Sequence, residues 1–412
     1  MENFSLKKLL FRNAGIQLTG QVVCLLIGLV TTFVLSRYLG VARFGGLNYI
    51  FAFYYFFFVL QDMGIDVVVI RECSKNPEQT ALIIGTMRSY KIIVSLFFMG
   101  IAWVIIRIIP YSLALKPSLF VYSFILPILA LEHPAVAFQI NLNVKYSTVN
   151  ALLKTISSFI FLVTLIAAGL GMTGYVLALV LSEVIVLVSI HFFSRRFVRP
   201  LWTIDWKICR MILKSGFVLA AMGVFVSLIN RIDFIMLERM TDLNQVGFYA
   251  AVYKITNLLE VLPLTVMGTL YPVMSRYAHA KDKTRLRIIH WKSFFLLAAI
   301  ALPLGIGVTL FAGPITRLIF GAAFLPSAAG LRVLIWATVF LYLAITSGNL
   351  LISLGCEKIT LAASIAAAAI NIVLNFFWIP RYGFVGAAYA TVASFFTLFI
   401  VNLFSASRIL KD

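Results

Sequence analysis

The sequence predicts an all-α, polytopic membrane protein of about 12 transmembrane helices, on the strength of its composition, its apolar runs and an internal repeat. Of the 412 residues, 62% are hydrophobic and 12% are charged, and the mean hydropathy is +1.02. Soluble domains carry roughly twice that charged fraction, which they need to cover their surface. The composition excludes an ordinary soluble enzyme, a disordered protein and a secreted disulfide scaffold.

Apolar runs long enough to cross the hydrocarbon core, roughly 20 residues each, follow one another along the whole chain. The candidate spans are 14–36, 47–69, 82–106, 118–140, 148–169, 174–193, 214–236, 247–273, 291–312, 328–353, 360–379 and 384–405. Six of them lie on each side of a basic connection near 194–213. We therefore expect an N-terminal six-helix lobe over 1–200 and a C-terminal six-helix lobe over 201–412.

The two halves show a weak internal repeat. The connection after the first span ends Arg43-Phe44-Gly45-Gly46-Leu47-Asn48-Tyr49, and the connection after the seventh ends Gln245-Val246-Gly247-Phe248-Tyr249 at the matching offset. Because each half has an even number of spans, both halves start on the same side of the membrane, and the repeat is parallel. Two such bundles around a central cavity form a transporter architecture.

Basic residues outnumber acidic residues by 34 to 15, for a net charge of +19. In a soluble protein this excess would suggest a nucleic-acid partner, but in a membrane protein basic loops set the topology, so we expect none. With the N-terminus inside, the cytoplasmic side receives 24 of the 34 basic residues. We expect a multi-pass protein of the inner (plasma) membrane with both termini cytoplasmic, in which 1–37 is an uncleaved first span.

The sequence lacks the motifs of common enzyme classes. It has no G-x-x-x-x-G-K-[ST] or H-E-x-x-H motif, and its four histidines are scattered. No extramembrane segment is long enough to fold as a catalytic domain. We expect a transporter, not an enzyme, with no cofactor and no metal site.

Charged side chains at membrane depth are costly and usually face the protein interior, so they are the candidate functional residues. The candidate substrate-binding cations are Lys254, Arg88, Lys154 and Arg231. The candidate coupling carboxylates are Glu260, Asp62 and Glu183. Glu260 has no cation one helical turn away, which leaves it free to bind and release a proton.

Several of these residues have a structural alternative. Arg88 and Arg231 could extend their side chains to the headgroup region. Lys154 and Glu183 lie at similar depth on adjacent helices and could form an ion pair. Asp233 could neutralise a cation on a neighbouring helix. Lys254 is too deep to reach either surface, which makes it the strongest candidate for a substrate contact.

The stretch from Asn371 to Thr391, which includes Pro380-Arg381-Tyr382-Gly383, resembles a hallmark of one transporter family. That family is the polysaccharide-transporter branch of the multidrug/oligosaccharidyl-lipid/polysaccharide (MOP) flippase superfamily, whose members include Wzx-type flippases, or O-antigen translocases. Weaker matches are Tyr38-Leu39-Gly40 to Phe44-Gly45, Asp62-Met63-Gly64 to Arg71-Glu72, and Leu354 to Lys358.

The resemblance implies two six-helix lobes forming a V around a cavity. It implies alternating-access movement of an undecaprenyl-diphosphate-linked oligosaccharide, an O-antigen, capsule or exopolysaccharide unit, from the inner to the outer leaflet. The partners would be that substrate, membrane lipids, and the polymerase and chain-length components of polysaccharide or lipopolysaccharide synthesis. Lys254 is similar to one of the cavity cations of MurJ-type lipid II flippases.

A multidrug or cation antiporter of the sister, MATE-like branch is the alternative. Such an antiporter needs an acidic cavity for its organic cations. The deep charges here are mostly basic, which favours an anionic substrate.

The orientation can be tested directly. Reporter fusions after Arg199 and after Asp412 should both report a cytoplasmic location, because the basic residues concentrate on that side. An external signal from either fusion would overturn the orientation and the number of spans.

Overall fold

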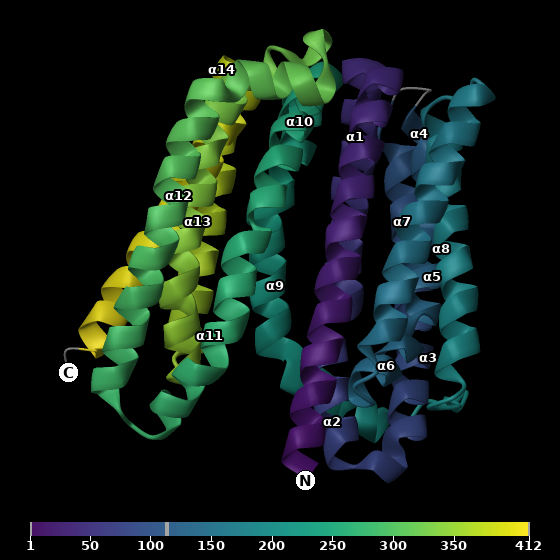
Figure 1. The fold of residues 1–412 in the computed structure, drawn as a ribbon. Coiled ribbons are helices and arrows are strands. Elements are labelled where there is room, and N and C mark those ends of the chain that lie inside the picture. The colour runs from purple at the N-terminus through teal and green to yellow at the C-terminus, as the bar shows by residue number, and fades with distance from the viewer. Residues whose placement is uncertain (1, 112–114, 411–412) are drawn as a thin grey trace. The chain divides into compact units, whose positions relative to one another are not determined.

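A computed structural model describes residues 2–111 and 115–410, and within those ranges every regular element is a helix (Figure 1). The α-helices are α1 (Glu2–Asp62), α2 (Ile65–Lys75), α3 (Thr80–Ile108), α4 (Leu115–Ser123), α5 (Ile125–Leu131), α6 (Val136–Ile140), α7 (Val144–Ala167), α8 (Met172–Ser194), α9 (Trp206–Met240), α10 (Leu243–Leu259), α11 (Val261–His279), α12 (Lys283–Phe320), α13 (Ser327–Ser353) and α14 (Glu357–Ile409). Short 3₁₀ helices are η1 (Pro77–Gln79), η2 (His133–Ala135) and η3 (Ala322–Phe324).

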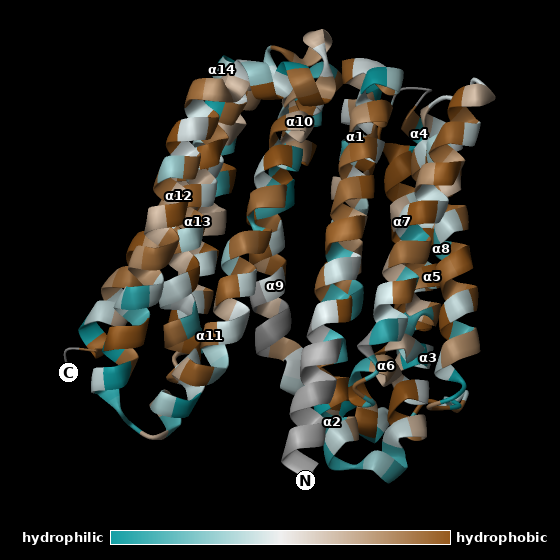
Figure 2. Cartoon of the chain, viewed as in Figure 1, coloured by the Kyte–Doolittle hydropathy of each residue, from teal (hydrophilic) through white to brown (hydrophobic). Residues whose placement is uncertain are grey.

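The helices are long and apolar enough for a multi-span membrane protein, which confirms the predicted class. Within the described ranges, eight segments have the length and hydropathy of a membrane span, or nine if the bent pair Leu115–Leu131 and His133–Ile140 is one span. Apolar residues cover most of their length, and polar residues collect near α2 and at the turn between α11 and α12 (Figure 2).

Glycine breaks the two longest helices. A continuous helix of 61 residues, such as α1, would extend about 90 Å, far more than the hydrocarbon core. The break in α1 is at Gly40 (φ 69°) and the break in α14 is at Gly383 (φ 58°), in the backbone region that favours glycine. Beside the second break, the Phe384 backbone N–H donates to the Gln245 side-chain oxygen at 3.0 Å, so that amide keeps a partner.

The chain forms two compact units, and each includes a segment from the other half of the sequence. Unit 1 comprises 1–39 and 54–223, and unit 2 comprises 40–53 and 224–412. Residues 40–53 therefore pack with the second half of the chain, and 201–223 pack with the first. The predicted lobes, 1–200 and 201–412, remain a prediction about the transport architecture.

Unit 1 holds the connection between the halves of the chain against α3. Gly85 of α3 lies so close to the connection that an added Cβ would be 2.1 Å from the Leu201 carbonyl oxygen. The Leu201 backbone N–H donates to the Ala81 carbonyl at 3.3 Å. A buried apolar cluster that includes Ile65, Ile84 and Ile212 joins α2, α3 and α9.

Unit 2 is built around α13, which packs against α10, α11, α12 and α14. Its apolar cluster includes Met267, Leu297 and Tyr342, all at most 2% exposed. Figure 1 shows α12, α13 and α14 side by side, with α11 crossing near the turn that leads into α12.

Two glycines bring α1 and α10 into backbone contact within unit 2. A Cβ added at Gly45 would lie 2.0 Å from the Leu243 carbonyl oxygen, and one added at Gly247 would lie 2.2 Å from the Val41 carbonyl oxygen. Neither neighbour is a flexible side chain, so any larger residue must push the two backbones apart.

Gly247→Ala should therefore lower the thermal unfolding temperature of the purified protein in detergent, by the equivalent of about 1–3 kcal/mol. Gly100→Ala is the matched control, because Gly100 lies within α3 and an added Cβ meets nothing within 4 Å. The control should be neutral or stabilising, since alanine is the better helix former. Equal unfolding temperatures for the two variants would contradict the close approach of α1 and α10.

Candidate functional site

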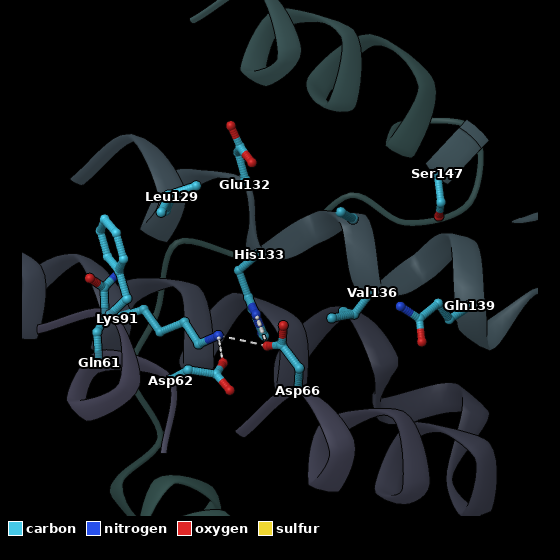
Figure 3. Close-up of a pocket in the computed structure, with 12 residues that line it drawn as sticks. Gln61, Asp62, Asp66, Lys91, Leu129, Glu132, His133, Val136, Gln139 and Ser147 are labelled. Carbon is cyan, nitrogen blue, oxygen red and sulfur yellow. Dashed lines mark hydrogen bonds and ion pairs between the residues drawn. The ribbon is translucent and has the colours of Figure 1, made fainter. Parts of the chain in front are cut away.

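A polar pocket of about 310 Å³ lies within unit 1 (Figure 3). It is formed by the end of α1, the start of α2, the middle of α3, and the segment from α5 through η2 to α7. Its polar lining comprises Gln61, Asp62, Asp66, Lys91, Glu132, His133, Gln139 and Ser147. Phe58 and Leu129 contribute apolar walls.

Lys91 is held by two carboxylates at this pocket. Its Nζ donates to Asp62 Oδ1 and to Asp66 Oδ1, each at 2.6 Å. The Lys91 side chain is 7% exposed, whereas those of Asp62 and Asp66 are 47% and 45% exposed. The ammonium group is therefore buried behind its partners, and the accessible part of the cluster consists of carboxylate oxygens. Asp62, a predicted coupling residue, is a partner of Lys91 in this structure.

His133 and Gln61 complete the polar wall. His133 Nδ1 lies 3.0 Å from Asp66 Oδ1, and the His133 side chain is fully buried. Gln61 is 5% exposed, and its Nε2 donates to the Leu126 carbonyl at 3.2 Å, which fixes the amide orientation. The Gln61 Oε1 and the His133 Nε2 are buried without a hydrogen-bond partner. Lys91, Asp62, Asp66 and His133 converge in Figure 3, while Glu132 points away from them.

Arg88 holds the connection between the halves of the chain. Its guanidinium stacks on the Trp202 ring at 3.8 Å and donates to the Pro200 carbonyl at 3.4 Å. Arg88 is 3% exposed, so its guanidinium is enclosed by the protein. Its predicted role as a substrate cation stays a prediction.

Lys154 and Glu183 form the ion pair that the sequence offered as an alternative. Lys154 Nζ donates to Glu183 Oε1 at 2.7 Å, with the lysine side chain 52% exposed and the glutamate 2% exposed. An acidic side chain so buried needs this cation, because leaving it unpaired is strongly destabilising. The predicted roles of Lys154 in substrate binding and of Glu183 in coupling stay predictions.

Three predicted residues come together in unit 2. Arg231 of α9 is close enough to act electrostatically on both Lys254 of α10 and Glu260, which follows α10. Lys254 is exposed on unit 2, and no carboxylate of the described part of the chain lies within ion-pair distance of it. This group therefore presents positive charge on helices of membrane-spanning length.

Asp233 of α9 is fully buried in unit 2 and is surrounded by hydrogen-bond donors. Thr391 Oγ1 donates to its Oδ2 at 2.6 Å, and Asn375 Nδ2 donates to its Oδ1 at 2.5 Å. The Tyr249 hydroxyl also donates to Oδ2. Asn375 Nδ2 lies 3.0 Å from Asn371 Oδ1 as well, which extends the network along α14.

The sequence suggested that Asp233 would neutralise a cation, but hydroxyl and amide groups hold it. No cation of the described residues lies within ion-pair distance of Asp233. Two of its partners, Asn375 and Thr391, belong to the C-terminal stretch that carries the family resemblance. Both are polar residues in an otherwise apolar helix. From the sequence alone they indicate a buried polar partner, since buried polar groups require partners.

A second, apolar hollow of about 570 Å³ lies on unit 1 along the start of α9. Trp206 and Phe217 contribute aromatic walls, and Arg210 and Lys214 contribute two cations one helical turn apart. Trp206 is 69% exposed and Phe217 is 62% exposed.

Comparison with known proteins supports the family resemblance. The family described as "Polysaccharide biosynthesis protein" matches residues 10–278, and the family "MatE" matches 219–377. The chain is 26% identical over 220 residues to "Uncharacterized membrane protein MJ1068" of Methanocaldococcus jannaschii, and 23% identical over 152 residues to "Probable low-salt glycan biosynthesis flippase Agl15" of Haloferax volcanii. These matches cover 53% and 37% of this chain and span 41% and 32% of those relatives, less than half of either.

Solved structures share the fold. "Lipid II flippase MurJ, inward closed conformation" superposes with a TM-score of 0.78 at 15% identity, covering 94% of this chain and 87% of that one. An inward-facing multidrug resistance MATE family transporter gives 0.76 at 14% identity, covering 94% of both chains. A MOP superfamily transporter from Pyrococcus furiosus gives 0.65 at 15% identity, covering 98% of this chain and 96% of that one. At these identities the likeness concerns the fold alone.

Removing one donor to Asp233 should destabilise the protein. Thr391→Val keeps the side-chain shape but removes the hydroxyl that donates to Asp233. The loss of that hydrogen bond should lower the free energy of unfolding by about 1–3 kcal/mol. Thr397→Val on the same helix is the control, because the Thr397 hydroxyl donates only to the Ala393 carbonyl of its own helix, at 2.9 Å. A thermal unfolding series that gives both variants the same stability would contradict the proposed network.

Proposed function

The chain belongs to the polysaccharide biosynthesis protein family. On that premise we propose that it is a transporter of the MOP superfamily rather than an enzyme, and that it is a flippase for a lipid-linked oligosaccharide. The proposed substrate is a polyprenyl-diphosphate-linked oligosaccharide, moved by alternating access from the cytoplasmic to the outer leaflet. A diphosphate and a sugar cannot cross hydrocarbon unaided, because their hydration must be replaced by protein groups.

Lys254 is the observation that carries this proposal. It is an exposed cation on a spanning segment, with Arg231 close by and no carboxylate at ion-pair distance in the described part of the chain. An uncompensated cation is expensive inside a membrane and indicates an anionic ligand. A diphosphate supplies that charge, and charge-assisted hydrogen bonds from lysine and arginine are among the strongest available.

The apolar hollow on unit 1 supports a substrate with a lipid tail. Arg210 and Lys214 suit a phosphate, and the aromatic walls of Trp206 and Phe217 suit a hydrocarbon chain beside it. We propose that membrane lipids and the polyprenyl part of the substrate occupy this surface.

The helix breaks, together with α9, which is not among the eight candidate segments, support twelve spans in two sets of six. Broken at Gly40, α1 supplies two arms, and α3, the bent α4–α6 segment, α7 and α8 complete the first set. The second set comprises α9, α10 with α11, α12, α13 and the two arms of α14 around Gly383.

The contacts of the two glycines support a parallel repeat. In the sequence repeat, Gly247 corresponds to Gly45 and Leu243 to Val41. Gly45 approaches Leu243, and Gly247 approaches Val41. Exchanging each residue for its counterpart in the repeat turns the first contact into the second. Reciprocal contacts of this kind are expected of two segments related by a two-fold axis.

For coupling, Glu260 is the strongest of the predicted carboxylates. Asp62 is engaged by Lys91, and Glu183 by Lys154. Glu260 forms no ion pair within the described residues and lies near Arg231, where its charge can respond to an arriving phosphate.

We propose the plasma membrane as the location, with both termini cytoplasmic.

A multidrug or cation antiporter is the second candidate, and the pocket of unit 1 favours it. The accessible carboxylates of Asp62 and Asp66 could bind an organic cation. Transport of a lipophilic cation, with no movement of a lipid-linked glycan, would establish this alternative.

Lys254 gives the most direct mutational test. Lys254→Ala should slow flipping of a fluorescent lipid-linked oligosaccharide in proteoliposomes by about tenfold or more, the loss expected for a charge-assisted hydrogen bond of about 1.5–3 kcal/mol. Lys254→Arg should retain more activity, because it keeps the charge. Lys283→Ala, which removes an exposed cation at the start of α12, should have no effect. Full activity of Lys254→Ala at matched protein levels would exclude a substrate contact at Lys254.

A further inference from the structure

We propose that the pocket of unit 1 around Asp66 and His133 is a subsite for one sugar residue of the carried glycan, and that this sugar is neutral or amine-bearing. The proposal rests on the proposed flippase function and deepens it. It places recognition of the sugar in unit 1, on residues other than Lys254 and Arg231.

The charge of the pocket selects against phosphate. Its one lysine, Lys91, is only 7% exposed and is satisfied by Asp62 and Asp66 at 2.6 Å each. The accessible groups are the two carboxylates, each nearly half exposed, so the cluster presents acceptor oxygens and a net negative charge. Hydroxyl and ammonium groups donate to such oxygens, whereas a phosphate is repelled.

Two buried polar atoms indicate that the pocket is built for a ligand. Gln61 Oε1 and His133 Nε2 have no hydrogen-bond partner, although Gln61 is 5% exposed and the His133 side chain is fully buried. The Gln61 amide cannot simply turn to find a partner, because its Nε2 already donates to Leu126. Buried polar groups in native proteins nearly always have a partner, and sugar hydroxyls can both donate and accept.

The size and walls of the pocket fit a sugar ring. A volume of 310 Å³ is near the lower end for small-molecule sites and would hold roughly ten water molecules. Phe58 and Leu129 offer apolar surface to the carbon face of a ring, while the carboxylates and Gln61 face its hydroxyls. This combination of apolar walls with a few fixed polar groups is typical of ligand pockets.

The place of the pocket in unit 1 suits loading of the substrate. The helices that form it, α2 and α6 among them, lie at the same end of the unit as the N-terminus (Figure 1). With the N-terminus in the cytoplasm, that end faces the compartment in which the glycan is assembled on its lipid.

The test is binding of small glycosides to the full chain in lipid nanodiscs, followed by saturation-transfer NMR. The probes are a methyl hexoside, a methyl glycoside of an amino sugar, a methyl uronide, inorganic pyrophosphate and a lipophilic phosphonium cation. Gln61→Leu removes the Oε1 acceptor, and with it the Nε2 donor to the Leu126 carbonyl, but it keeps every charge of the Lys91 cluster. Asp66→Asn removes a carboxylate, and Gln79→Leu, an exposed position outside the pocket, is the control.

We expect the neutral or amino glycoside to bind to the wild type and to the Gln79→Leu control, and its affinity to fall at least fivefold in Gln61→Leu. Pyrophosphate and the uronide should not compete. The proposal is overturned if no glycoside binds, if both pocket variants bind like the wild type, or if only the phosphonium cation binds.

Failure of this subsite differs from failure of the flippase function. Flipping of a lipid-linked glycan that is unaffected by Gln61→Leu and Asp66→Asn would reject the subsite and keep the function. Glycoside binding that depends on Gln61 without any flipping would reject the function and keep the subsite.

Discussion

An ionised side chain within a membrane span must be neutralised or hydrogen-bonded by the protein itself, and the polar interior of both units depends on that requirement. In unit 1, Lys91 is held by Asp62 and Asp66, and Glu183 by Lys154. In unit 2, Asp233 is held by hydroxyl and amide donors from α10 and α14. Burying such groups costs free energy, so we expect them only where they fix the packing of helices or bind a ligand.

Against that background, the charges without a counter-charge are the informative ones. Lys254 is exposed and has no carboxylate at ion-pair distance among the described residues, and Arg231 adds to its positive field. The pocket of unit 1 has the opposite character, with accessible carboxylates over a buried lysine. The two units therefore differ in the charge that they present: unit 2 carries an accessible cation, and unit 1 carries accessible carboxylates.

The sequence was sufficient for the class of protein and for its family. Composition and apolar runs predict a multi-span protein because a helix in lipid must satisfy its own backbone and expose apolar side chains. The stretch from Asn371 to Thr391 predicts the family, and the structure supplies a physical reason for part of it: Asn375 and Thr391 bind the carboxylate of Asp233. The sequence also placed Lys254, Lys154 and Glu183 within predicted spans, and in the structure all three lie in helical segments of spanning length.

The partners of those charges could not be predicted from the sequence, because they depend on the register between helices far apart in the chain. Asp62 and Asp66 are four residues apart, but the helix breaks between them, and nothing in the sequence indicates that Lys91 of α3 meets both carboxylates or that His133 of η2 meets Asp66. The packing of 40–53 with the second half of the chain depends in the same way on the backbone approach of Gly45 and Gly247 to α10 and α1, which only the fold reveals.

The most direct test of the central claim is a translocation assay on the purified protein in proteoliposomes. A lipid-diphosphate-linked oligosaccharide is incorporated, and its appearance in the opposite leaflet is followed with a membrane-impermeant glycosidase or lectin. The account predicts that the glycan becomes accessible much faster than in protein-free vesicles. Vesicles that move a lipophilic cation, while the glycan stays in its original leaflet, would contradict it.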